Sequence, residues 1–260
     1  MIRALLVRGM LAGLAAGLAA TMFAWSAGEP QIRDAIGFEE GHGAGGGHEH
    51  TAVAGQHSHE TAEAVVSRGV QETLGLSVAL ALFGIAIGGI YALVFAGFYG
   101  RLGSLSARPT AALLAAAGFV IVSLIPLLKY PANPPAVGSA DTVGTRTGLY
   151  LAMIGISVVA AIAAAGTGRR LVHRLGGWNA ALVGGAVFVV LVGIAYAALP
   201  GVDEVPAGFP AELLWKFRLA SLGTQAITWT VLGLVFGALA TREMNEESVR
   251  PGKTPTAIGT

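Results

Sequence analysis

The chain has 260 residues, of which 54% are hydrophobic and only 12% are charged, and its mean hydropathy is +0.67. A water-soluble surface needs about 25% charged residues, so this composition excludes an ordinary soluble protein and indicates a membrane protein. There is no cysteine, which excludes disulfides, thiolate metal sites and cysteine nucleophiles. The net charge is +1, and we expect no nucleic-acid partner.

Six segments are long and apolar enough to cross a hydrocarbon layer of about 30 Å, for which a helix needs about 20 residues. In chain order they cover about residues 5–25, 74–98, 110–128, 148–165, 178–199 and 219–240. We therefore predict an all-α polytopic membrane protein with about six transmembrane helices, forming one integral-membrane domain over residues 1–260. Glycines recur four residues apart in three of these segments, for example at Gly9, Gly13 and Gly17, and this spacing is typical of closely packed membrane helices.

The distribution of arginine and lysine predicts the orientation in the membrane. With the N-terminus inside, the inner segments hold ten of these residues and the outer segments hold six, as expected when positive residues are retained in the cytoplasm. The prediction is N-in and C-in, with a first extracytoplasmic loop over about 27–72 and a cytoplasmic tail over about 241–260. The first apolar segment also resembles a secretory signal, but its length of about 20 residues exceeds the usual signal core of about 7–15 and favours a retained helix.

The predicted first outer loop is rich in histidine and holds five of the six histidines of the chain. In a flexible, extended segment, residues two apart project to the same side, so each His-x-His pair can present two imidazoles to one ion. Imidazole and carboxylate suit divalent transition metals, and histidine-rich tracts are typical of metal binding. A polar linker that holds no metal is the alternative. The candidate metal ligands are His42, His48, His50, His57, His59, Glu39 and Glu40.

Two further outer segments hold polar residues at the predicted membrane edge. The first, over about 126–146, is too rich in proline for a regular helix or sheet and predicts a rigid loop. The second, over about 199–218, holds adjacent carboxylates that are either metal ligands or ion-pair partners of nearby basic residues. Lysine and tyrosine here can also be ordinary interface anchors, whereas a buried arginine would require a partner. The candidates for an entrance rim are Lys129, Tyr130, Asn133, Arg146, Asp203, Glu204 and Arg218.

Several sequence motifs of catalysis are absent from the chain. There is no GxxxxGK[ST] loop for nucleotides, no HExxH zinc motif and no GxSxG nucleophile turn. The predicted helices also carry no acid or base near their centres, so no proton relay is recognisable in them. We therefore expect that the protein is not an enzyme and holds no permanent cofactor.

Several stretches match one known family in the order in which they occur, over nearly the whole chain. They are residues 6–17, 28–31, 38–40, 67–71, 128–138 (LKYPANPPAVG) and 205–210, of which the proline-rich stretch is the most specific. The chain thereby resembles the CbtA family, the predicted cobalt transporter subunit. The resemblance implies a multi-pass protein of the bacterial inner membrane, a role in cobalt uptake linked to cobalamin synthesis, and a small single-helix partner of the CbtB type. It assigns no functional residue.

The leading hypothesis is therefore a membrane subunit of a divalent-metal uptake system, with cobalt favoured, in which the outer His/Glu loop collects the ion. A flexible imidazole tract prefers copper, nickel or zinc over cobalt at equal availability, so selectivity would have to come from the packed helices. The alternatives are a non-transporting scaffold or metal chaperone for another permease, a transporter of nickel or another metal, and efflux in place of uptake. Besides the possible small subunit, the only expected partner is the lipid bilayer.

Overall fold

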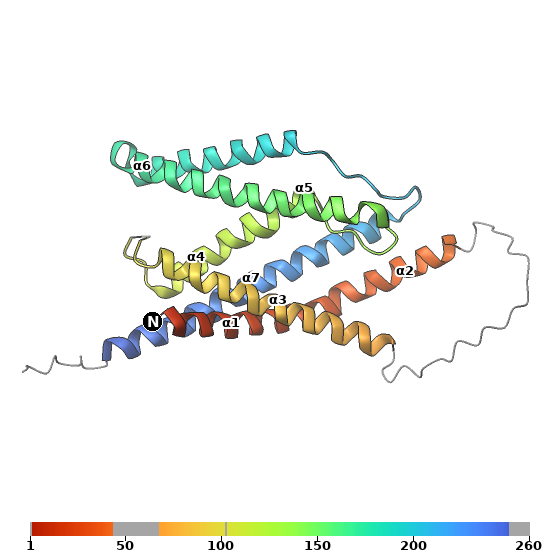
Figure 1. The fold of residues 1–260 in the computed structure, drawn as a ribbon, viewed down its shortest axis with the longest axis horizontal. Coiled ribbons are helices and arrows are strands. Elements are labelled where there is room, and N and C mark those ends of the chain that lie inside the picture. Colours follow the sequence, from red (N-terminus) through yellow and green to blue (C-terminus); the bar gives the residue numbers. More distant parts are fainter. Residues whose placement is uncertain (1, 44–67, 102, 250–260) are drawn as a thin grey trace, which may run out of the picture. The chain divides into compact units, whose positions relative to one another are not determined.

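The computed structural model describes residues 2–43, 68–101 and 103–249 (Figure 1). The described residues form helices joined by turns, without a strand among them, and this confirms the predicted all-α class. The elements are α1 (Ile2–Phe23), η1 (Ala24–Gly28), α2 (Glu29–Gly43), α3 (Arg68–Phe98), α4 (Ala107–Gly118), η2 (Phe119–Leu124), α5 (Ile125–Lys129), η3 (Ala140–Thr142), α6 (Val143–Ala198) and α7 (Ala211–Val249).

Within the described residues, five helices are long and apolar enough to cross a membrane by length and composition. Two of them run through a π-helical turn, η1 or η2, which inserts an extra residue without ending the helix. This length and composition is that of a membrane protein. The five cover Ile2–Glu40, Leu74–Phe98, Ala107–Lys129, Val143–Ala198 and Ala211–Met244.

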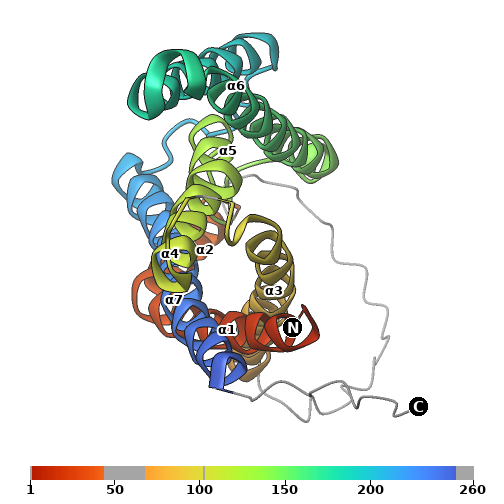
Figure 2. The same ribbon diagram turned by 90° about the vertical axis from the view of Figure 1, so that its left-hand side faces the viewer.

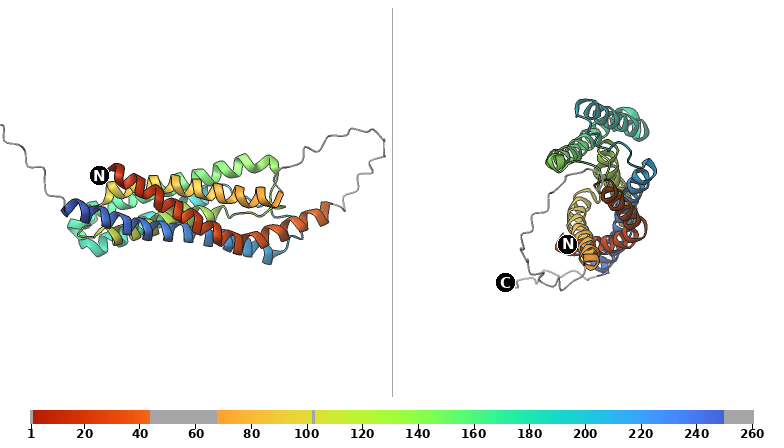
Figure 3. Two further views of the ribbon diagram at one scale, coloured as in Figure 1. Left: turned by 90° about the horizontal axis from the view of Figure 1, so that it is seen from below. Right: turned by 90° about the vertical axis from the view of Figure 1, so that its right-hand side faces the viewer.

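The 56-residue helix α6 consists of two arms that meet at Gly176. This residue has φ 75° and ψ 165°, a backbone conformation that is not helical and that a glycine adopts without strain. A Cβ atom added to Gly168 would lie 3.3 Å from the carbonyl oxygen of Ala180, and one added to Gly184 would lie 3.0 Å from that of Ala164. In both contacts a residue before Gly176 meets one after it, and the residue further before the bend meets the one further after it. The two arms therefore run antiparallel in close contact (Figures 1 and 3). The predicted segments 148–165 and 178–199 lie on the two arms.

The chain divides into two compact units. The first lies within Met1–Ala20, Ser77–Ala117 and Ile227–Thr260, and it contains most of α1, α3 and α4 together with the second half of α7 (Figure 2). In it, α1 and α3 pack backbone to backbone, because a Cβ atom on Gly13 would overlap the carbonyl oxygen of Gly84 and one on Gly9 would overlap that of Gly88. Such close approach allows dispersion contacts that larger side chains would prevent.

The other contacts of this unit join α7 to the remaining helices. The Tyr91 hydroxyl donates a hydrogen bond to the carbonyl oxygen of Ala111 on α4, and its ring packs edge-on against Phe236 of α7 at a centroid distance of 5.2 Å. Near the beginning of α1, Arg8 forms an ion pair with Glu243, and its Nη1 atom donates to the carbonyl oxygen of Leu239 at 3.2 Å. An ion pair that is only partly exposed compensates a charge next to apolar helices.

The second unit lies within Thr21–Leu76 and Gly118–Ala226. It contains α2, η2, α5 and the α6 hairpin, with the first part of α7. One cluster of buried residues forms around Tyr130 and Met153, and another joins Ala35 to Val137 and Phe209. This second cluster connects α2 to the two loops that carry the candidate rim residues.

The helices reach further than the sequence predicts. The sequence predicts a first loop over 27–72, but Glu29–Gly43 form α2 and α3 already begins at Arg68. The reason is tertiary packing: Ala35 is fully buried, and the Phe38 ring packs edge-on against Phe209 at 5.0 Å. A polar segment with many glycines gains helical structure here because one of its faces is buried against a loop that is distant in sequence.

Candidate functional site

The proline-rich segment after α5 forms the frame of the candidate site. Proline has no backbone N–H, so the helix ends at Tyr130, which has φ −125° and ψ 79°. Beyond it, the N–H of Val137 donates to the carbonyl oxygen of Pro134 at 3.2 Å and closes a turn. Val137 is buried in the cluster with Ala35 and Phe209, which anchors the segment to the helices. A loop fixed in this way can hold neighbouring side chains in defined positions.

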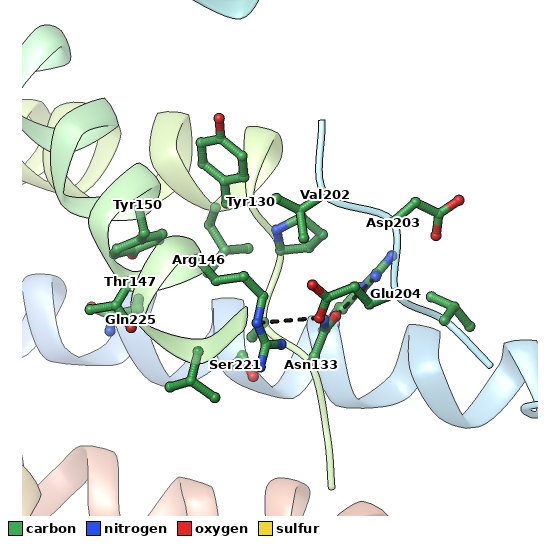
Figure 4. Close-up of a pocket in the computed structure, with 16 residues that line it drawn as sticks. Tyr130, Asn133, Arg146, Thr147, Tyr150, Val202, Asp203, Glu204, Ser221 and Gln225 are labelled. Carbon is green, nitrogen blue, oxygen red and sulfur yellow. Dashed lines mark hydrogen bonds and ion pairs between the residues drawn. The ribbon is translucent and has the colours of Figure 1, made fainter. Parts of the chain in front are cut away.

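Arg146, from the first turns of α6, lies flat on this loop at Gly138. A Cβ atom at residue 138 would overlap the Arg146 guanidinium, lying 2.7 Å from Cζ and 2.8 Å from Nη2, and Gly138 also has φ +112°. Both observations require glycine here. On its other side, Arg146 Nε lies 3.4 Å from Glu204 Oε2 (Figure 4). The same oxygen accepts a hydrogen bond from the Ser139 N–H at 3.3 Å. The ion pair joins α6 to the loop before α7.

Arg218 approaches the same loop from α7. Its Nη2 atom donates to Oδ1 of Asn133 at 3.2 Å. Within the part of the chain that the structure describes, no carboxylate lies within ion-pair distance of this guanidinium, and its buried Nε atom has no hydrogen-bond partner. The Nε atom of Arg146 is likewise buried without a hydrogen bond. The proline-rich loop therefore holds two cations, one paired with a carboxylate and one bonded to a neutral amide.

Lys129 and Tyr130 at the end of α5 bond to the chain at the end of α6. Lys129 Nζ donates to the carbonyl oxygen of Tyr196 at 2.9 Å, and the Tyr130 hydroxyl donates to that of Pro200 at 2.9 Å. Burial raises the pKa of Tyr130 above its ordinary value of 10.0, so the phenol stays protonated at neutral pH and remains a donor. These bonds fix the entry and exit of the proline-rich loop.

The loop and the helices around it line an open cavity of about 430 Å³ (Figure 4). Of the seven residues proposed from the sequence as an entrance rim, six line this cavity; Lys129 does not, because its ammonium group is directed to Tyr196. The structure thus brings together residues from four separate parts of the sequence. The lining residues are Leu127, Tyr130, Pro131, Ala132, Asn133, Val143, Arg146, Thr147, Tyr150, Val202, Asp203, Glu204, Val205, Arg218, Ser221 and Gln225.

Sequence reasoning found Arg146 and Arg218 but missed other polar lining residues on the same helices, among them Ser221 and Gln225. Ser221 and Gln225 follow Arg218 at intervals of three and four residues, so the three share one face of α7. Gln225 Oε1 accepts a hydrogen bond from the Ser123 hydroxyl at 3.1 Å, which links this face to η2. In the sequence, these three polar residues on one face of an otherwise apolar helix were a recognisable sign of a functional surface.

The residues proposed as metal ligands do not come together in the described structure. Glu39 and Glu40 are exposed near the end of α2, and His42 lies on its last turn. The predicted ligands His48, His50, His57 and His59 lie outside the described residues. Among the described residues, no group of three or more His, Asp or Glu side chains is arranged to hold a metal ion. Metal capture by this tract stays a prediction.

The cavity combines two guanidinium groups, two carboxylates, amides and hydroxyls with apolar walls. Its formal charges balance, and Asp203 is exposed while Glu204 is engaged by Arg146. Convergent polar groups in a concave and otherwise apolar surface are typical of a binding site for a small polar ligand. This set of groups provides binding and orientation for such a ligand.

Comparison with known proteins identifies the family of the chain. Residues 2–241 match the family model described as "Probable cobalt transporter subunit (CbtA)". No curated protein and no solved structure matches the chain. A transporter-subunit family implies a non-enzymatic role in transport. Because the match covers nearly the whole chain, this membrane protein belongs to the CbtA family, described as probable cobalt transporter subunits.

Proposed function

We propose that this chain is the integral-membrane subunit of an uptake system for a divalent transition metal, with cobalt as the favoured ion, in the inner membrane of a bacterium. The family match over residues 2–241 carries the proposal. The long apolar helices support it, since they supply the hydrophobic length that a permease subunit needs. The transported ion is the substrate of this system and not a resident cofactor.

In the proposed topology the two arms of α6 cross the membrane separately, which gives six spans and returns the chain to the side on which it began. Each arm, residues 143–175 or 177–198, exceeds the length of about 20 residues that a span requires. The excess of arginine and lysine in the inner segments supports an inner location of both termini. The histidine-rich tract and the cavity then both belong to the outer side.

The outer side has two proposed tasks. The tract with Glu39, Glu40 and the histidines collects ions from dilute solution, as imidazole and carboxylate ligands do. The cavity forms the entrance, with the exposed carboxylate of Asp203 as its first ionic contact and the loop bonded to Tyr130 as its frame. Selectivity depends on a more rigid site than the tract, and a small single-helix subunit of the CbtB type is the proposed partner in forming it.

Uptake of radioactive cobalt tests this proposal. Cells that lack their own cobalt uptake system would express the chain with and without the small partner, and nickel would be compared with cobalt. The matched variant changes all five outer histidines to Ala: His42, His48, His50, His57 and His59. We expect chain-dependent uptake that drops in the variant at low cobalt and recovers at high cobalt, as a collector would cause.

Three other results would change the proposal. Uptake that does not depend on the chain at any cobalt concentration would favour the non-transporting scaffold or metal chaperone. Faster accumulation of nickel than cobalt would reassign the ion, and chain-dependent loss of preloaded cobalt would reverse the direction. Purified protein in liposomes then separates a transporter from a scaffold, because only a transporter moves the ion without another permease.

A further inference from the structure

The unusual group of the cavity is the Arg218 guanidinium. It is a half-buried cation on a helix that is apolar enough to span a membrane, and it donates a hydrogen bond to the neutral amide of Asn133. Arginine at such a position is costly unless an anion or several acceptors compensate it. Within the described residues no carboxylate pairs with it, and its Nε atom is buried without a hydrogen bond. Within the described residues, the Arg218 guanidinium is therefore hydrogen-bonded to the Asn133 amide and forms no ion pair.

Neither carboxylate of the same cavity pairs directly with Arg218. Glu204 Oε2 already faces Arg146 Nε at 3.4 Å and accepts from the Ser139 N–H at 3.3 Å. Asp203 is exposed, and no ion pair joins it to either arginine in the described structure, so its charge acts on Arg218 only from beyond ion-pair distance. A half-buried charge with one neutral acceptor and an unused donor would be stabilised by a further acceptor, and most by an anionic one.

The position of Arg218 is fixed before any ligand arrives. Asn133 lies in the proline-rich loop, which Tyr130 and Val137 hold in place through the hydrogen bond to Pro200 and the buried cluster. A guanidinium that is held in advance loses less conformational entropy on binding than a free side chain does. The cavity of about 430 Å³ next to it has room for a small polar group.

We propose that this cavity binds an oxyanion, a phosphate group, through the Arg218 guanidinium, with Arg146 as the second cation of the lining. The planar fork of a guanidinium matches two oxygen atoms of such a group and forms charge-assisted hydrogen bonds with them. The oxyanion is either a free small anion or the phosphate of a lipid headgroup. The cavity is the one proposed above as the metal entrance, but anion binding is measured without metal, so the two proposals can fail separately.

Thermal unfolding of the purified full-length protein tests the site. The protein is kept in a phospholipid-free detergent and a chloride buffer of constant ionic strength, and inorganic phosphate is added. At about 100 times the dissociation constant we expect the melting temperature to rise by about 5 °C. A parallel titration with phosphatidylglycerol, against a glycolipid without phosphate, distinguishes a headgroup from a free anion. A response to either phosphate source supports the site, and no response to both would overturn it.

Two substitutions on one helix separate a specific site from general charge effects. Arg218→Gln should weaken phosphate binding about tenfold or more, because a charge-assisted hydrogen bond is lost. Lys216→Gln removes the same charge two residues away, from an exposed side chain that pairs with Glu212 at 2.7 Å, and should keep the response. Equal responses of the wild type and Arg218→Gln would refute the assignment.

A third variant places the anion in the protein itself. Asn133→Asp puts a carboxylate opposite Arg218 in nearly the same shape. We expect it to raise the melting temperature measured without phosphate and to weaken the affinity for phosphate at least tenfold. This variant also decides the matter if Arg218→Gln fails to fold, because an unchanged phosphate response in Asn133→Asp would contradict the proposal.

Discussion

Gly138→Ala tests whether the proline-rich loop positions Arg146. An alanine at φ +112° lies in the left-handed region, which costs an L-residue about 1–2 kcal/mol. Its Cβ atom would also overlap the Arg146 guanidinium, so the side chain would have to move away from Glu204. Loss of this partly buried ion pair adds about 1 kcal/mol. We therefore expect a total destabilisation of about 2–3 kcal/mol.

The chain offers a matched control in Gly208, which has φ +86° and no atom within 4 Å of the position that a Cβ atom would take. Gly208→Ala should show the backbone cost alone, about 1–2 kcal/mol. The assay is unfolding of the purified protein in detergent, complemented by a double-mutant cycle of Gly138→Ala with Arg146→Gln. We expect a coupling energy of about 1 kcal/mol, since without the guanidinium the new methyl group displaces nothing. Equal losses in the two glycine variants with zero coupling would refute the positioning role of the loop.

Two further predictions concern the first unit. Gly13→Ala should destabilise the protein by more than about 2 kcal/mol, because the added methyl group would overlap the Gly84 carbonyl. The measurement is unfolding of the purified protein. The control is Gly155→Ala, where the methyl group meets open space and should be neutral or slightly stabilising. Arg8→Glu alone should lower stability by about 1 kcal/mol or more, and adding Glu243→Arg should recover part of it by restoring an ion pair. Failure of the swapped pair to recover any stability would show that the Arg8 contact to the Leu239 carbonyl dominates instead.

The positions of the apolar helices could be predicted because a hydrocarbon layer imposes a length and a composition on each of them. The predicted second helix, 74–98, coincides with the apolar part of α3, Leu74–Phe98. The helix α2 could not be predicted in this way. Its polar sequence has no spanning signal, and it depends on the contact between Phe38 and Phe209, which are far apart in sequence.

The cavity was partly predictable. Proline density marked the loop around Asn133 as rigid, and an arginine at the mouth of a helix indicated the need for a partner. The sequence could not show that Arg146 would pair with Glu204 while Arg218 would meet an amide, because such choices depend on how α6 and α7 approach the loop. The spacing of Arg218, Ser221 and Gln225 shows that they share one helix face, but the sequence alone could not show that this face lines the cavity.

The hairpin of α6 has a consequence for the order in which the protein is made. Its arms touch at Gly168 and Ala180, only twelve residues apart, so closing it costs little chain entropy and needs no other helix. The contact of Asn133 with Arg218 spans 85 residues and requires α7. During synthesis the hairpin can therefore form while α7 is still being translated, and the cavity is completed only after α7 has been inserted. A chain that ends before α7 would then keep the hairpin without the site.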